Sequence, residues 1–326
     1  MTLSTHTRAL RAATLFLGAL ACVRADTKPP AVAVVLWHGM GDTCCGGMLD
    51  VKARIETNVK GAYVHSVQLG STVAEDERAG FFGFVDAQLE AVCSTLSADE
   101  NLAGGFHAVG FSQGGLLLRG LVQRCPSLRV HTLVTMGSPH GGVTEVPGCP
   151  ASGDKALCTQ MRRLLDAGAY SKWIRGAVVQ AQYFRDAYNL HTYLQNSQFL
   201  ADINNERDAK NMTYAKQISS LKKLVLFRFS NDTTVVPRDS AWFSFQDGDN
   251  LMPLRSTALY QMDWLGLYHL DRAGSVIMDE APGVHMQFTL DWFEAKVIIP
   301  WLATPSAMDD ALLLGPAQTQ AATAYA

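Results

Sequence analysis

Five residues in the first half of the chain, Gly110-Phe111-Ser112-Gln113-Gly114, match the pattern G-x-S-x-G. The glycines of this pattern allow a tight turn between a strand and a helix, and the turn directs the serine hydroxyl outward above the carboxyl end of a sheet. The apolar stretch 106–110 predicts the strand before the serine, and 115–124 predicts the helix after it. A chance glycine-rich turn would not require this context. The pattern therefore predicts Ser112 as a nucleophile.

A serine nucleophile needs a base to remove its proton, and the base needs a carboxylate to orient it. Where the serine lies in this kind of turn, the chain order is serine, then Asp or Glu, then histidine. Asp232 follows a predicted strand over 222–229, at the place where a loop at the sheet edge would present an acid. Asp239 is its nearby competitor, with Asp247 and Asp249 further along the chain. We predict Asp232 as the acid.

The predicted base is His285, which lies in the loop EAPGVH before the last helical stretch. Its rival is His269, in a segment with a more helical pattern. His107 and His131 lie in or beside predicted strands and are better explained as packed or hydrogen-bonded side chains. The remaining candidates precede the acid and so break the expected order; they are His38, His65, His140 and His191.

A serine that attacks a carbonyl carbon also requires two backbone N–H groups that stabilise the developing oxyanion. One comes from the residue after the nucleophile, here Gln113. The second comes from a loop after an early strand, and the segment His38-Gly39-Met40-Gly41 has the right place and small residues. We predict Met40 as this donor; the alternative is a plain glycine turn.

The elements that must position these residues alternate between strand and helix. Strands are predicted at 32–37, 63–69 and 130–136, and helices at 50–60 and 81–96. This alternation predicts an α/β fold with a mainly parallel sheet. Residues 26–145 and 222–303 form the predicted core, the polar and helical stretch 146–221 is a predicted insertion, and the Ala-rich tail 304–326 is expected to be disordered.

Composition and the first 25 residues restrict the class of protein. The chain has 326 residues, 48% of them hydrophobic and 17% charged, which excludes a disordered or collagen-like chain. A net charge of −3 argues against a nucleic-acid partner. Arg8 and Arg11 precede the short apolar run 12–21, so residues 1–25 predict a secretory signal peptide rather than an uncleaved anchor. No later stretch is long and apolar enough to predict a transmembrane segment.

Cysteines and sequons agree with a secreted chain. Six cysteines remain beyond the signal, at positions Cys44, Cys45, Cys93, Cys125, Cys149 and Cys158. An even number predicts disulfides, but six cysteines allow 15 connectivities. A zinc site is less well supported, because there is no repeated CxxC and no HExxH, and we expect no metal or other cofactor. Asn211 and Asn231 begin glycosylation sequons.

Several segments together resemble the lysosomal palmitoyl-protein thioesterases: LWHGMGDTCC, GFSQGG, AGAYSKW, FLADINNER and VHMQF, with the strand end at Asn231-Asp232. The resemblance covers roughly residues 31–302. It implies an α/β-hydrolase whose insertion shapes an acyl groove and which removes long-chain fatty acyl groups from cysteine thioesters of proteins or peptides, and also from acyl-CoA. It also implies the roles of Ser112, Asp232, His285, Met40 and Gln113 given above, a lysosomal location, and the disulfide pairs Cys44–Cys45, Cys93–Cys125 and Cys149–Cys158.

Two segments depart from the family pattern. Val236 stands where the resemblance leads us to expect an aspartate, and 136–142 reads more like a generic lipase segment, which we expect to affect the acyl pocket rather than the catalytic residues. Apolar residues of the insertion could line an acyl groove or simply form its core; they are Trp173, Ile174, Val178, Val179, Tyr183, Phe184, Phe199 and Leu200. Other functions left open are an oxygen-ester lipase or phospholipase and a non-catalytic lipid-binding protein. The sequence gives no indication of oligomeric state.

Overall fold

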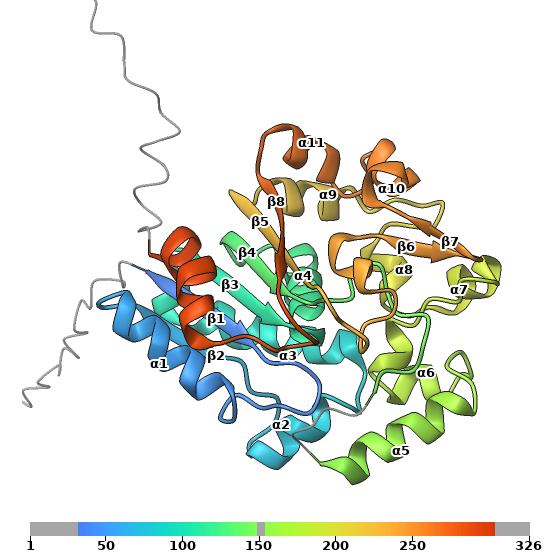
Figure 1. Ribbon diagram of the computed structural model, residues 1–326, viewed down its shortest axis with the longest axis horizontal. Coiled ribbons are helices and arrows are strands. Elements are labelled where there is room, and N and C mark those ends of the chain that lie inside the picture. The colour runs from blue at the N-terminus through green and yellow to red at the C-terminus, as the bar shows by residue number, and fades with distance from the viewer. Residues whose placement is uncertain (1–31, 149–153, 304–326) are drawn as a thin grey trace, which may run out of the picture.

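A central sheet of six parallel strands organises the protein (Figure 1), and the computed structural model describes residues 32–148 and 154–303. The strand order is β2-β1-β3-β4-β5-β8, and every neighbouring pair is parallel. The strands are β1 (Ala33–Trp37), β2 (Tyr63–Ser66), β3 (Phe106–Phe111), β4 (Val130–Met136), β5 (Lys223–Phe229) and β8 (Val276–Ala281). The predicted parallel α/β fold is confirmed. The predicted signal peptide and the tail lie outside the described residues.

The continuous apolar run of β1 follows from burial on both faces of the sheet. Ala33, Val35 and Trp37 pack in one hydrophobic cluster, and Val34 and Leu36 pack in the cluster on the opposite face. Side chains alternate between the faces of a strand, so a central parallel strand needs apolar residues at every position. Burial of both faces therefore explains why the strands could be recognised as unbroken apolar runs.

Helices cover both faces of the sheet (Figure 1). Helix α1 packs against the C-terminal helices, whereas α3 packs against α4, and α4 also packs against α9 (Met212–Ser219). The helices of the first half are α1 (Met48–Asn58), α2 (Val73–Ala79), α3 (Val85–Ala98) and α4 (Gln113–Arg124). The predicted helix over 81–96 begins later, at Val85, because Phe81 is fully buried and Phe82 bridges to Val178 of the insertion.

Short helices make up the segment between β4 and β5. They are α5 (Lys155–Asp166), α6 (Ile174–Ala177), α7 (Leu190–Asn196), α8 (Leu200–Ile203) and α9 (Met212–Ser219). Most of the apolar residues proposed for an acyl groove are core residues: Val178, Val179, Tyr183, Phe199 and Leu200 are at most 3% exposed. Trp173 is 66% exposed instead. The buried members of the set therefore serve as core of the insertion.

After β5 the chain forms a small hairpin and returns to the sheet. The elements are β6 (Phe245–Asp247), β7 (Asn250–Met252), α10 (Ala258–Gln261), α11 (Leu267–Arg272), α12 (Leu290–Phe293) and a π-helical segment, Glu294–Leu302. Pro300 lies inside this last segment, where it offers no N–H to the helix. The predicted C-terminal helical stretch is therefore present but irregular.

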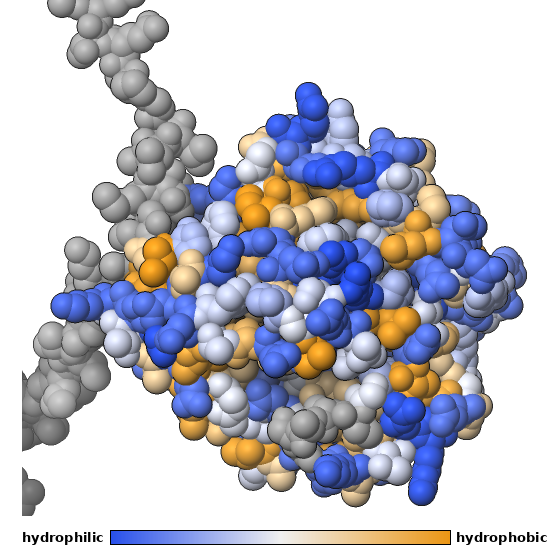
Figure 2. Space-filling view, in the orientation of Figure 1, coloured by the Kyte–Doolittle hydropathy of each residue, from blue (hydrophilic) through white to orange (hydrophobic). Residues whose placement is uncertain are grey.

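Two disulfides join described cysteines, Cys44–Cys45 and Cys93–Cys125, as the family resemblance implies. Cys158 is also disulfide-bonded, and its expected partner Cys149 lies outside the described residues. On the face drawn in Figure 2, apolar side chains form small separate patches between polar ones. Within 32–148 and 154–303, none of the helices has the length and apolar character needed to cross a membrane.

Candidate active site

Ser112 lies in a strained turn between β3 and α4, as the G-x-S-x-G pattern predicts. Its backbone has φ 51° and ψ −122°, a conformation that residues other than glycine rarely adopt. The flanking glycines are required by close contacts: a Cβ on Gly110 would lie 2.2 Å from the Cα of Gly115, and one on Gly114 would lie 2.3 Å from the carbonyl oxygen of His38. The turn therefore presents the serine side chain at the carboxyl end of the sheet.

The structure brings the three predicted catalytic side chains together. The Nε2 atom of His285 lies 2.8 Å from the Oγ atom of Ser112, and its Nδ1 atom lies 2.6 Å from Oδ2 of Asp232. The His285 side chain is 13% exposed, and that of Asp232 is 2% exposed. A proton can therefore pass from the serine to the histidine, while the carboxylate orients the ring and stabilises its charged form.

Local hydrogen bonds hold the side chain of Asp232 in place, and the alternative candidates for the acid have other partners. Oδ1 of Asp232 accepts from the backbone N–H groups of Thr234 and Val235, at 2.8 and 3.0 Å, which leaves Oδ2 for the histidine. Asp239 instead forms an ion pair with Arg228, and Asp249 accepts a hydrogen bond from Tyr188. His269, the rival base, is an exposed residue of α11.

The loop after β4 lies close to the ring of His285, the predicted base. Gly137 has φ 61°, and a Cβ there would lie 2.9 Å from the ring of Phe229 and 3.2 Å from Cε1 of His285. Phe229 in turn packs edge-on against the His285 ring, with centroids 5.9 Å apart. Gly137 therefore lies close to the base and leaves no room for a side chain there, whereas the expected effect of 136–142 on the acyl pocket stays a prediction. His140 of the same segment is fully buried beside Arg119 and Phe243.

The two predicted oxyanion donors flank Ser112. A Cβ on Gly39 would lie 3.1 Å from the Cβ of Ser112, and Met40 lines the same cavity as Ser112. On the other side, Gln113 begins α4, and its buried side chain donates to the carbonyl of Gly80 at 3.0 Å. Its Oε1 atom accepts from Gln180 at 2.8 Å and from the Tyr183 hydroxyl at 3.0 Å. The insertion thus contacts the active site through Gln113.

A cavity of about 460 Å³ opens beside Ser112 and His285. Most of its side chains are apolar, and Asp42 and Thr234 add polar groups. The apolar lining residues are Met40, Met48, Val51, Phe111, Met286 and Phe288. Among the described residues, the predicted insertion 146–221 contributes Gly148 to this lining. The apolar surface next to the nucleophile is therefore built by the loop after β1, by α1, by the end of β3 and by the loop after β8. The sequence patterns did not indicate this lining.

A second His–Asp pair near the site was also missed. His38 was set aside because it precedes the acid in the chain, yet its Nε2 lies 3.2 Å from Oδ1 of Asp76, and both residues are buried. Burial lowers the pKa of His38, but the hydrogen bond and the charge of Asp76 outweigh it, so the pKa lies above its ordinary value. Burial raises the pKa of Asp76, yet His38 and two backbone N–H groups bring it below its ordinary value. Asp76 belongs to the polar sequence VAEDERA, where nothing distinguishes it from its solvated neighbours.

Comparison with known proteins agrees with this geometry. The family model for palmitoyl protein thioesterase matches residues 33–285. The chain belongs to the palmitoyl protein thioesterase family. The palmitoyl-protein thioesterase 1 of Caenorhabditis elegans is 43% identical over 261 residues, 78% of this chain and 87% of that protein. The palmitoyl-protein thioesterase 3 of Dictyostelium discoideum is 33% identical over 276 residues, 84% of this chain and 90% of that protein.

As a member of this family, the chain is a hydrolase that acts on thioesters, with the α/β-hydrolase fold. Among solved structures, a monoacylglycerol lipase from Paleococcus ferrophilus matches with a TM-score of 0.42 and 14% sequence identity, over 85% of this chain and 96% of that one. Both predicted glycosylation sites are exposed. Asn211 caps α9 through its side-chain oxygen, and Asn231 directly precedes Asp232.

Proposed function

We propose that this thioesterase releases long-chain fatty acyl groups, such as palmitoyl, from S-acylated cysteines of proteins and peptides, and from acyl-CoA, through an acyl-serine intermediate. The observation that carries the proposal is the continuous chain of contacts from Asp232 through His285 to Ser112, beside a cavity with an apolar lining. Family membership supports the thioester bond as the target. The contacts that join Asp232, His285 and Ser112 argue against a non-catalytic lipid-binding protein.

In the first half of the reaction, His285 takes the hydroxyl proton of Ser112 as the serine oxygen attacks the thioester carbonyl carbon. The carbonyl oxygen becomes an oxyanion, which the backbone N–H groups of Met40 and Gln113 stabilise. Asp232 stabilises the positive charge that forms on His285. The carbon–sulfur bond then breaks, and the cysteine thiol leaves with the proton from His285.

In the second half, the acyl group remains esterified to Ser112. His285, neutral again, removes a proton from a water molecule, and the hydroxide attacks the acyl carbon. The tetrahedral intermediate uses the same two N–H groups, and its collapse returns the proton to the serine oxygen and releases the fatty acid. Every step uses groups of this chain, the substrate and water.

The cavity is the proposed site of the acyl chain next to the reacting carbon. Met40, Met48 and Met286 present flexible thioether side chains, which adapt to an alkyl chain, and Val51 and Phe288 add apolar surface. A volume of about 460 Å³ lies in the range of small-molecule sites. The acyl groove expected within the insertion 146–221 stays a prediction, and Gly148 is the described residue of that segment that lines this cavity.

The test is fatty acid release from an S-palmitoyl peptide and from palmitoyl-CoA by the purified protein and its Ser112→Ala variant. We expect release by the wild type, no release by the variant, and labelling of Ser112 alone by a fluorophosphonate. A matched oxygen ester of the same peptide, with serine in place of cysteine, tests the lipase alternative. Faster hydrolysis of the oxygen ester than of the thioester would overturn the proposed substrate class.

We also propose that the protein acts along the secretory route, with the lysosome as its destination. The predicted signal peptide, the exposed sequons at Asn211 and Asn231, and the disulfides support entry into that route. The proposal of a lysosomal location rests on the family resemblance. Immunofluorescence of the tagged full chain tests this, and a cytosolic signal would contradict it.

A further inference from the structure

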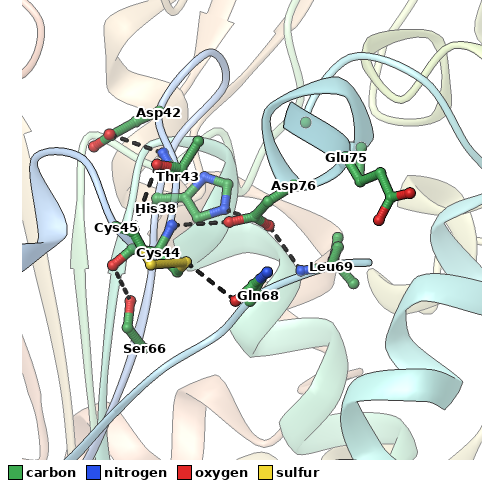
Figure 3. A network of polar contacts seen from close by, with 12 residues as sticks. His38, Asp42, Thr43, Cys44, Cys45, Ser66, Gln68, Leu69, Glu75 and Asp76 are labelled. Atoms are coloured by element: carbon green, nitrogen blue, oxygen red, sulfur yellow. Dashed lines mark hydrogen bonds and ion pairs between the residues drawn. A yellow bond between two sulfur atoms is a disulfide. The ribbon is translucent and has the colours of Figure 1, made fainter. Parts of the chain in front are cut away.

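One buried carboxylate holds both ends of the loop that carries Met40. Oδ1 of Asp76 accepts from Nε2 of His38 at 3.2 Å, and Oδ2 accepts from the backbone N–H of Cys44 at 2.8 Å. Oδ1 also accepts from the backbone N–H of Leu69 at 2.7 Å. Figure 3 shows these three donors converging on the Asp76 side chain, which is 0% exposed. Met40 lies between His38 and Cys44, so the carboxylate fixes the loop before and after it.

The helix that carries Asp76 also contacts the second oxyanion donor. Helix α2 begins with a capping box, in which Thr72 accepts from the Glu75 N–H and the Glu75 carboxylate accepts from the Thr72 N–H. It is followed by Gly80, whose carbonyl accepts from the Gln113 side chain. A Cβ on Gly80 would lie 3.6 Å from the backbone N of Gly41 and 3.8 Å from the Cα of Met40. One short helix therefore supports the backbone on both sides of Ser112.

We propose that Asp76, acting through His38 and the Cys44 N–H, is the positioning residue of the oxyanion hole and sets the direction of the Met40 N–H group. The inference rests on the proposed function only in naming Met40 as an oxyanion donor. Oxyanion stabilisation depends on donors that are already aimed at the developing charge, so a small displacement of this loop lowers the rate without removing any reacting group.

A carboxylate is the one side chain of this size that satisfies all three donors. Asparagine has the same shape, but only one of its two terminal atoms accepts hydrogen bonds. In Asp76→Asn, the amide NH₂ must face either the N–H of Cys44 or the donors at Leu69 and His38. Either the Cys44 N–H loses its acceptor, or the Leu69 N–H loses its acceptor and His38 must give up the Nε2 proton that it donates to Asp76.

The first experiment compares Asp76→Asn with Glu75→Gln, which removes one negative charge from the neighbouring, exposed position of the same helix and retains a capping-box residue. For S-palmitoyl peptide hydrolysis we expect Asp76→Asn to lower kcat by about 100-fold, comparable to loss of one oxyanion donor, with KM nearly unchanged. Glu75→Gln keeps wild-type kcat. Equal kcat in the two variants would overturn the proposal.

Two inhibitors separate positioning from general damage to the fold. A palmityl trifluoromethyl ketone adds to the Ser112 oxygen and places an oxyanion in the hole, whereas an S-hexadecyl cysteine peptide, a thioether, fills the same site without reacting. We expect Asp76→Asn to weaken the ketone in parallel with kcat and to leave the thioether affinity unchanged. A parallel loss of both affinities would show a merely structural role and overturn the proposal.

Variants of His38 keep the test valid if Asp76→Asn does not fold. Glutamine can reach Asp76 with an N–H donor in place of Nε2, whereas asparagine retains only a donor in place of Nδ1, which lies 2.8 Å from the Gly39 carbonyl. We expect His38→Gln to bind the ketone more tightly than His38→Asn; the reverse order would contradict the proposal. Ketone binding needs a working Ser112 and no thioester, so wild type that binds the ketone but cleaves no thioester would refute the proposed function alone.

Discussion

The site holds two Asp–His pairs, Asp232–His285 and Asp76–His38, and they differ in what the second ring nitrogen contacts. In the pair Asp232–His285, that nitrogen lies 2.8 Å from the Ser112 hydroxyl. In the pair Asp76–His38, it lies 2.8 Å from the Gly39 carbonyl oxygen. The side chains are also unequally accessible, at 13% for His285 and 2% for His38.

This difference gives the two Asp–His pairs different tasks, although both consist of the same two residue types. A hydroxyl can give its proton to a ring nitrogen, so His285 can act as a base. A carbonyl oxygen only accepts, so His38 is best satisfied when both of its nitrogens carry protons. Its ring then joins Gly39 to Asp76 and holds the loop in place. Proximity to a carboxylate therefore does not identify a catalytic histidine; the partner of the other nitrogen does.

The largest expected effect comes from removing the base. His285→Ala leaves Ser112 without a proton acceptor, and we expect kcat on the S-palmitoyl peptide to fall by about 10⁵–10⁶-fold. His269→Ala, which changes an exposed histidine of α11, is the matched control and keeps wild-type kcat. Steady-state assays on both variants measure this. A loss below about 100-fold for His285→Ala would mean that another group serves as the base.

The second prediction concerns Asp232, the proposed acid. Asp232→Asn can no longer stabilise the charged His285 ring, and we expect kcat to fall by about 10⁴-fold while the protein remains folded. Asp239→Asn is the control, because Asp239 pairs with Arg228 rather than with a histidine. We expect its kcat to stay close to the wild-type value. Similar losses in the two variants would leave the choice of acid unsupported.

The sequence predicted the fold and the three side chains that meet at Ser112 because each leaves a local signal. Parallel strands buried on both faces appear as unbroken apolar runs, and β4 was placed at its observed bounds, 130–136. The glycines around Ser112 are required by the turn itself. Asp232 and His285 could be chosen because the order of the three groups along the chain is restricted in this fold.

The supporting groups could not be predicted, because their roles depend on packing. Asp76 lies in a short polar helix, and its burial follows from how that helix packs against the loop after β1. The same limit applies to the residues that line the cavity. Val178 and Phe199 are as apolar as Met48 and Met286, and only the fold decides that the first two are core and the last two line the cavity.

A third prediction concerns how stability depends on pH. The pKa of folded His38 lies above its ordinary value, so its contribution to stability is complete below about pH 6.5 and is lost as the pH rises through the folded pKa. The charged groups that act on it are Asp76 of α2 and Asp42 of its own loop. We expect His38→Gln to be less stable than wild type by about 2 kcal/mol near pH 6, with a smaller difference at alkaline pH. Urea unfolding across this range measures it, and a difference that grows with pH would contradict a charged His38.

The smallest expected effect lies where the insertion reaches the site. Tyr183 is buried and donates its hydroxyl to Oε1 of Gln113, and burial raises the pKa of that hydroxyl, so it remains a donor throughout the working range. In Tyr183→Phe, Gln113 keeps the hydrogen bond from Gln180 but loses the one from the phenol. We expect kcat to fall by about fivefold, the equivalent of one neutral hydrogen bond. Tyr188→Phe removes an exposed hydroxyl of the insertion that contacts Asp249, and its kcat should match wild type. If Tyr183→Phe also matched wild type, the insertion would not help to place the Gln113 N–H, and the position of that group would depend on α4 and Gly80 alone.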